Sequence, residues 1–81
     1  MEDEELLNLI LERLYRDSQG VLSVRNALNQ EGHYFRKNQL NRVMSDIKNN
    51  GFALISKSDD DYQAQISPEG LLYCEETLMI R

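Results

Sequence analysis

Several residue types are scarce in this chain of 81 residues, and their scarcity excludes whole classes of protein. The single cysteine, Cys74, cannot form a disulfide within the chain. One cysteine and one histidine, His33, are also too few for a structural zinc site, which is almost always four-coordinate. We therefore expect no metal and no cofactor.

Long apolar runs are absent as well. The longest, such as Leu9-Ile10-Leu11, are far shorter than the roughly 18 residues that are needed to span a bilayer. The first residues, Met1-Glu2-Asp3-Glu4-Glu5, are acidic, whereas a secretory signal begins with basic residues. The sequence therefore predicts a cytoplasmic protein that makes no contact with a membrane.

Catalytic patterns are missing too. No feature of the sequence pairs His33 with Cys74 or with a serine as a base and a nucleophile. The four glycines are isolated, so none of them forms a Gly-rich phosphate-binding loop. Cys74 falls on or beside the apolar face of the last predicted helix, where a buried thiol acts as a small hydrophobic group. We expect that the protein is not an enzyme.

What the chain does contain is an ordinary globular composition with an acidic balance. Hydrophobic residues make up 41% and charged residues 28%, which is typical of a soluble folded domain. Fourteen acidic residues against nine lysines and arginines give a formal net charge of -5. Because a domain usually takes roughly 100–200 residues, we expect a single domain over residues 1–81.

Apolar spacing predicts two helices in the first part of the chain. The first has its apolar stripe at Leu6, Leu7, Ile10, Leu11 and Leu14. Asp17-Ser18-Gln19-Gly20 then ends this helix, with Gly20 in a left-handed conformation. Val21-Leu22 forms one edge of a small sheet, and Ser23 caps a short second helix that ends at Gly32.

The middle of the chain predicts a third helix and a hairpin. A turn at His33-Tyr34-Phe35, with two aromatics to bury, precedes a helix from Arg36 or Lys37 to Asn49. The apolar face of that helix consists of Leu40, Val43, Met44 and Ile47. After Gly51 the period changes to two, which predicts a β-hairpin over residues 52–66 with a polar loop at 58–61. We expect Leu54 to be its most deeply buried residue.

A last helix follows the hairpin. Ser67 is its N-cap and Pro68 its first residue. Its apolar side is formed by Leu71, Leu72, Cys74, Leu78 and Met79. The predicted fold class is therefore α+β, mainly α, in the order helix, short strand, helix, helix, β-hairpin, helix.

This order, together with three stretches of sequence, resembles the winged helix-turn-helix family and its small bacterial members. Residues 21–28 are similar to the first short strand and second helix of the family, and residues 40–55 to its recognition helix running through a glycine into the wing. Residues 66–73 resemble the "Ile/Leu-Thr/Ser-Pro-x-Gly" entry into the helix after the wing. The resemblance covers about residues 6–78. It implies binding of duplex DNA through the third helix, or of a protein through the same surface or the wing.

One solvent-facing stripe of the third helix carries side chains that suit DNA. It consists of Asn38, Arg42, Ser45 and Asn49, spaced by four, three and four residues. Asparagine can read adenine and arginine can read guanine in the major groove. Arg36, Lys37 and Lys48 flank the stripe and are positioned for phosphates. A solvated helix face with no ligand is the alternative interpretation.

The hairpin loop also has two interpretations. Asp59-Asp60-Asp61 could hold a divalent cation loosely, but its spacing matches no EF-hand loop. Turns favour aspartate for its hydrogen bonds to the backbone, so we favour a solvated hairpin tip. Its negative charge would repel phosphate.

Self-association is predicted from apolar residues on the first and last helices that lie outside their buried stripes. The candidate interface residues of a homodimer are Leu9, Tyr15, Tyr73 and Ile80.

Taken together, these features predict a small winged-helix protein that binds duplex DNA as a transcriptional regulator or accessory factor. The helix of residues 36–49 would enter the major groove. The alternative is a winged-helix protein–protein interaction module without DNA binding, which the acidic total charge and the acidic hairpin favour.

Overall fold

A computed structural model describes residues 1–79 of the chain, and its helices and strands follow the predicted order. The elements are α1 (Asp3–Arg16), β1 (Leu22–Ser23), α2 (Val24–Gln30), α3 (Lys37–Asn49), β2 (Ala53–Ser58), β3 (Asp61–Ile66) and α4 (Pro68–Glu76). The described chain is therefore α+β and mainly helical, with a three-stranded antiparallel sheet.

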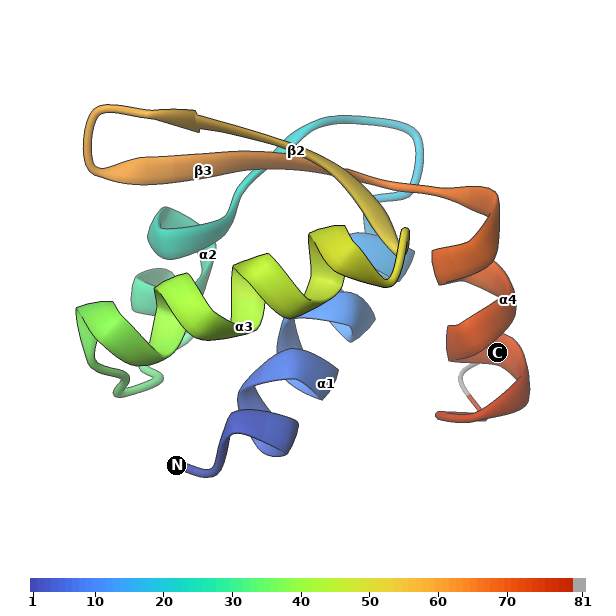
Figure 1. Cartoon of the computed structure of the whole chain (residues 1–81), viewed down its shortest axis with the longest axis horizontal. Helices are drawn as coiled ribbons and strands as arrows, with labels where there is room; N and C mark the ends of the chain where they lie inside the picture. The colour runs from blue at the N-terminus through green and yellow to red at the C-terminus, as the bar shows by residue number, and fades with distance from the viewer. Residues whose placement is uncertain (80–81) are drawn as a thin grey trace.

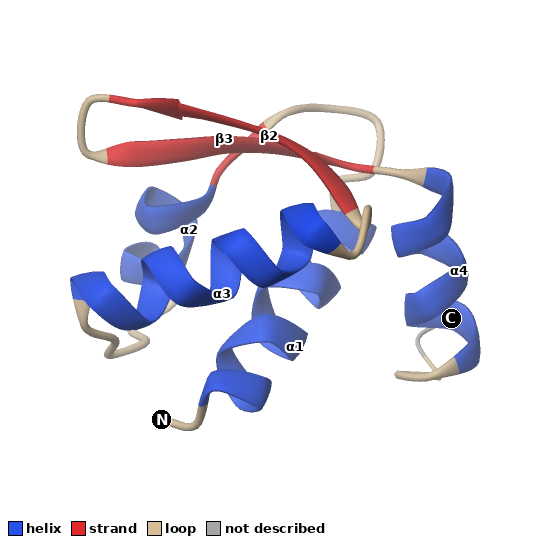
Figure 2. Ribbon diagram, in the orientation of Figure 1, coloured by secondary structure: helices blue, strands red, loops and turns tan. Residues whose placement is uncertain are grey.

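The helices and the sheet enclose one apolar core. Figure 1 shows the hairpin of β2 and β3 lying across α2 and α3, with α1 beneath α3 and α4 to one side. Figure 2 shows the strands as one layer above the helices. The largest fully buried side chains are Leu6, Ile10, Leu11, Leu14, Val24, Val43, Met44, Ile47 and Cys74.

Helix α3 forms as its apolar period predicts. Leu40, Val43, Met44 and Ile47 are all at most 3% exposed, so the predicted apolar face is the face that packs on the core. The helix ends where Gly51 adopts a φ of 72°. Glycine tolerates this left-handed conformation without steric cost, which is why the chain can turn there into β2.

The strands pair in the order β1-β3-β2, and their register contradicts the predicted burial of Leu54. Ala53 pairs with Ile66, and both side chains are buried. Because successive side chains of a strand point to opposite faces, Leu54 faces outward and is 72% exposed. The apolar run Phe52-Ala53-Leu54-Ile55 does not alternate with polar residues, and therefore it could not indicate which alternate set faces the core.

The turn between β2 and β3 is tighter than the predicted four-residue loop. The strands extend to Ser58 and from Asp61, which leaves only Asp59 and Asp60 between them. Asp59 has a φ of 43°, a left-handed conformation that aspartate tolerates better than most residues. Ser58 and Asp61 are thus paired strand residues rather than loop residues.

Four further predictions of local structure are wrong. Helix α1 ends at Arg16 with Asp17 as its C-cap, and Gly20 does not adopt a left-handed conformation. Tyr34 is 90% exposed, because only its neighbour Phe35 packs against the core. Leu72 is exposed as well, since α4 packs through Gly70 and Cys74, each about 200° around the helix from it. Met79, also expected on the apolar side of α4, is 72% exposed.

The start of α4 is joined tightly to the start of β2. As predicted, the Ser67 side chain caps α4, accepting a hydrogen bond from the Gly70 N–H at 3.1 Å. The Ser67 hydroxyl in turn donates to the Gly51 carbonyl, and the Ser67 N–H donates to the Phe52 carbonyl at 3.0 Å. Tyr73 stacks on Phe52 with ring centroids 4.5 Å apart. The helix therefore lies directly against the backbone that leaves α3.

Gly70→Ala tests this close approach. A Cβ at Gly70 would lie 2.0 Å from the Phe52 carbonyl oxygen, a contact with backbone that a rotamer change cannot relieve. We expect a loss of about 3 kcal/mol or more in the free energy of unfolding measured in urea. Gly20→Ala is the matched control, since nothing lies within 4 Å of its added Cβ, and its effect should stay below about 0.5 kcal/mol. Equal stability of the two variants would contradict the packing of α4 on Phe52.

Candidate nucleic-acid interface

The solvent face of α3 presents all seven residues that the sequence predicts as DNA contacts. Arg36 is the N-cap residue of the helix, and the other six lie within it. All seven are exposed: Arg36, Lys37, Asn38, Arg42, Ser45, Lys48 and Asn49. The burial of the opposite face on the core fixes their orientation, because a helix that packs one side must present the other to solvent.

These residues divide into two edges and a centre. At about 100° per residue, Lys37 and Lys48 lie on one edge of the solvent face, and Arg42 lies on the other. Asn38, Ser45 and Asn49 occupy the centre between them. The Lys edge faces the hairpin, since Tyr62 on β3 donates its hydroxyl hydrogen bond to Asn41 of α3. The Arg42 edge faces the first turn of α1.

Arg42 is already engaged by a carboxylate. Its Nε lies 3.1 Å from Oδ2 of Asp3, and its Nη2 lies 3.1 Å from Oδ1, so the guanidinium binds both carboxylate oxygens. Hydrogen bonds from Arg42 and then from Gln39 lower the pKa of Asp3. The hydrogen bond to Asp3 in turn raises the pKa of Arg42. Within residues 1–79, the other six predicted contacts make no side-chain hydrogen bond or ion pair.

The hairpin adds residues near α3 that the sequence pattern does not predict. Lys57 lies over the Tyr62 ring with its Nζ 5.5 Å from the ring centroid, and it borders a small hollow between the hairpin and the start of α3. Arg25 of α2 borders the same hollow and donates to the Asp60 carbonyl at 3.2 Å. The Asn41 oxygen accepts from Tyr62, which leaves its amide donors for a ligand. Only the strand register, which places Lys57 opposite Tyr62, could have indicated this grouping.

The three aspartates of the hairpin lie in two different environments. Asp61 is not a solvated tip residue: its Oδ1 accepts from the Arg25 N–H at 2.7 Å and its Oδ2 from the Asn26 N–H at 3.2 Å. It caps α2 from the hairpin, whereas Ser23, the predicted cap, makes no side-chain capping bond. Asp59 and Asp60 are exposed at the tip.

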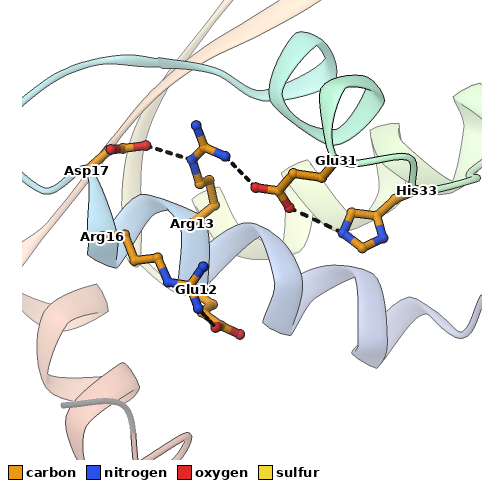
Figure 3. Close-up of polar contacts among 6 residues, drawn as sticks. All are labelled: Glu12, Arg13, Arg16, Asp17, Glu31 and His33. Carbon is orange, nitrogen blue, oxygen red and sulfur yellow. Dashed lines mark hydrogen bonds and ion pairs between the residues drawn. The ribbon is translucent and has the colours of Figure 1, made fainter.

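A polar network fixes the turn that leads into α3 (Figure 3). Arg13 of α1 contacts both Asp17, at 2.7 Å, and Glu31 at the end of α2. Glu31 also lies 3.2 Å from His33 Nε2. The hydrogen bond from Arg13 is the main reason that the pKa of Glu31 is lowered. These contacts hold the segment between α2 and α3 against α1.

An open hollow of about 700 Å³ lies at the beginning of α3. It is lined by Met1, Tyr34, Phe35, Arg36, Asn38, Gln39 and Arg42. The exposed Tyr34 and two arginines line the same hollow, so this end of the helix combines an aromatic side chain with positive charge. The prediction that Tyr34 is buried is wrong, and its ring belongs to the surface of this hollow.

The three described residues of the predicted dimer interface do not form one exposed surface. Leu9 and Tyr15 are half-buried and lie about 120° apart around α1, and Tyr15 packs against the core. Tyr73 is engaged in its stack on Phe52. Tyr73 therefore contributes to the packing of the subunit itself. Ile80 lies outside the described residues.

The described residues contain no exposed thiol and no group of side chains that could hold a metal ion. Cys74 is fully buried, and burial, followed by the nearby Glu12 and Glu75 carboxylates, raises its pKa to about 11. Its thiol is thus protonated at neutral pH. Within residues 1–79, no three His, Cys, Asp or Glu side chains lie close enough to hold a metal ion. In the same part of the chain, every helix is too short or too polar to cross a bilayer.

Asp61→Ala tests the cap that joins the hairpin to α2. Losing a carboxylate that accepts two helix N–H groups should lower the free energy of unfolding by about 1 kcal/mol in urea denaturation. Asp60→Ala removes the same charge from the same turn but leaves the cap intact, and we expect less than about 0.5 kcal/mol. Equal losses in the two variants would show that Asp61 does not stabilise α2.

Comparison of the chain with known protein families, with curated proteins and with solved structures finds no match. A function for this protein is therefore inferred from the exposure, contacts and charges of its own residues.

Proposed function

We propose that this protein is a winged helix-turn-helix domain that binds duplex DNA by inserting α3 into the major groove. The arrangement of α1, α2 and α3 beneath a β-hairpin, with the short β1 paired to β3, is compatible with that fold. The observation that carries the proposal is the solvent face of α3. Six polar or basic side chains there are exposed and uncommitted within residues 1–79, and they sit on a helix held rigid by its buried face.

On this face, the side chains that can contact DNA bases lie apart from those that can contact phosphates. Asn38, Ser45 and Asn49 lie at its centre, where amide and hydroxyl groups can meet base edges. Lys37 and Lys48 lie along the edge nearest the hairpin, where they can meet phosphates. Arg36 lies at the start of the helix, where it too can meet a phosphate. Asp59 and Asp60 of the hairpin tip line the same small hollow as Lys37, so their negative charge weakens the attraction of this edge for phosphates.

The distribution of charge supports an orientation toward a polyanion. Residues 33–50 contain four basic residues against Asp46 and thus carry +3, whereas the rest of a chain of net charge -5 carries -8. Such a polarised molecule turns its basic face toward DNA as it approaches. The proposed biological role is that of a transcriptional regulator or accessory factor, and a homodimer would present two copies of α3 to one duplex.

A second candidate is a protein-interaction module, and a specific observation favours it. Leu54 on β2 is 72% exposed on the outer face of the sheet, and Val21 beside β1 is 62% exposed. By register, Val21 continues the row that contains Gln65 and Leu54, so the two apolar side chains flank one polar residue across the sheet. A partner with an apolar contact and basic groups for the hairpin tip would fit this face.

A titration with duplex DNA separates the two candidates. With about three phosphate contacts per subunit, log K should fall with a slope near -2.7 against log salt, so affinity should drop roughly 40-fold between 50 and 200 mM. A dimer that engages both α3 helices should give a slope near -5. Fluorescence anisotropy measures these slopes, and NMR shifts on mixed-sequence DNA identify the surface.

Lys48→Ala should weaken binding to all duplexes alike and reduce the slope by about 0.9. Arg16→Ala is the matched control. Arg16 is an exposed basic residue that lies on α1 rather than on α3, and it is paired with Glu12. It should leave both the affinity and the slope nearly unchanged. Absence of NMR shifts on α3 at low salt would overturn the DNA proposal, and shifts confined to the sheet on addition of a partner would favour the second candidate.

A further inference from the structure

Arg42 differs from the other predicted DNA contacts because its donors are already occupied. Its Nε and Nη2 each lie 3.1 Å from an oxygen of Asp3, which is the bidentate arrangement that a guanidinium also makes with a phosphate or with guanine. The same two N–H groups cannot bind both acceptors at once. Arg42 is therefore either paired with Asp3 or available to a ligand.

Asp3 is held in place by a residue of α3 itself. Gln39, which is only 9% exposed, donates from its Nε2 to Oδ1 of Asp3 at 3.1 Å and to the Met1 carbonyl. Gln39 and Arg42 lie on the same side of α3, so the helix holds the beginning of α1 along its edge. Figure 1 shows this end of α1 below the first half of α3.

We infer that Asp3 is a built-in competitor of DNA for Arg42, an inference that rests on the proposed function of α3. The carboxylate occupies the position of a ligand anion and neutralises one of the four basic residues of segment 33–50. Phosphate and guanine both offer Arg42 a bidentate acceptor, but either must displace Asp3 before it can bind. As long as Asp3 stays in place, Arg42 adds no contact to DNA.

The competition responds to the ligand and not to physiological pH. Hydrogen bonds from Arg42 and Gln39 lower the pKa of Asp3, so the carboxylate stays charged until the solution is more acidic than its usual titration range. The side chains of Arg42 and Asp3 are 60% and 45% exposed, and exposed ion pairs are weak and sensitive to salt. A DNA anion can therefore reach and exchange with the pair without unfolding α1.

Asp3→Asn tests the inference, with Glu4→Gln as its matched control. Both changes remove one negative charge from the first turn of α1, but Glu4 is exposed and makes no side-chain bond to Arg42 within residues 1–79. Releasing Arg42 adds one phosphate contact. We therefore expect Asp3→Asn to steepen the salt slope by about 0.9 and to raise affinity about 15-fold at 50 mM and about fourfold at 200 mM. Glu4→Gln should change affinity less than about twofold.

The same pair of changes in an Arg42→Ala background identifies the route of the effect. If Asp3 acts through Arg42, the gain from Asp3→Asn should fall to that of Glu4→Gln once Arg42 is absent. In the protein without DNA, the NMR signal of Arg42 Nε–H should move and exchange faster in Asp3→Asn, but not in Glu4→Gln. The NMR measurement examines the ion pair independently of any nucleic acid.

Distinct outcomes overturn the two proposals. DNA binding on α3 with equal effects of Asp3→Asn and Glu4→Gln would overturn the competition and leave the DNA proposal standing. A gain from Asp3→Asn that persists in Arg42→Ala would overturn it too, because the effect would then be one of general charge. Failure of both the wild type and Asp3→Asn to bind duplex DNA at 50 mM salt would overturn the proposed function together with this inference.

Discussion

The structure depends on the junction at which α3, the hairpin and α4 meet. The Phe52 N–H donates to the Ile47 carbonyl at 3.1 Å, which closes the end of α3, and the Phe52 carbonyl accepts from the Ser67 N–H at 3.0 Å. Gly70 lies so close to that carbonyl that no side chain fits. The end of β3 and the start of α4 are thereby fastened to the residue that begins the sheet. Because this junction fixes the direction in which the chain leaves α3, it also holds the solvent face of α3 in place.

Two aspartates from acidic stretches of the sequence connect distant parts of the fold. Asp61 joins the hairpin to α2 through the N–H groups of Arg25 and Asn26, and Asp3 joins α1 to α3 through Arg42 and Gln39. The first is a helix cap that replaces the one predicted for Ser23. The second uses a side chain of the proposed DNA face. Some carboxylates of this acidic chain thus have a structural role. One of them, Asp3, lies against the basic surface of α3.

Local patterns predicted those features that a few neighbouring residues decide. The apolar face of α3, the Ser67 cap and the glycine after α3 were correct, because helical period and capping depend on residues within one or two turns. The predicted burial of Leu54 is wrong, because a continuous apolar run cannot show which alternate residues face inward. The contacts of Asp3 and Asp61 join residues more than thirty positions apart, and composition gives no indication of such pairs.

The exposure of the predicted DNA residues followed from the helical period, but their availability did not. Period alone placed the six residues within α3 outside the core, since a residue opposite a buried stripe faces solvent, and Arg36 is exposed as the N-cap residue. Only the fold shows that Arg42 has a partner, that Asn41 accepts from Tyr62, and that Lys57 borders the start of α3. With Arg42 paired, the free charge of segment 33–50 falls from +3 to +2. So small an excess gives few phosphate contacts and weak non-specific binding, and in the proposed complex the amide and hydroxyl groups at the centre of α3 must therefore supply a large share of the affinity.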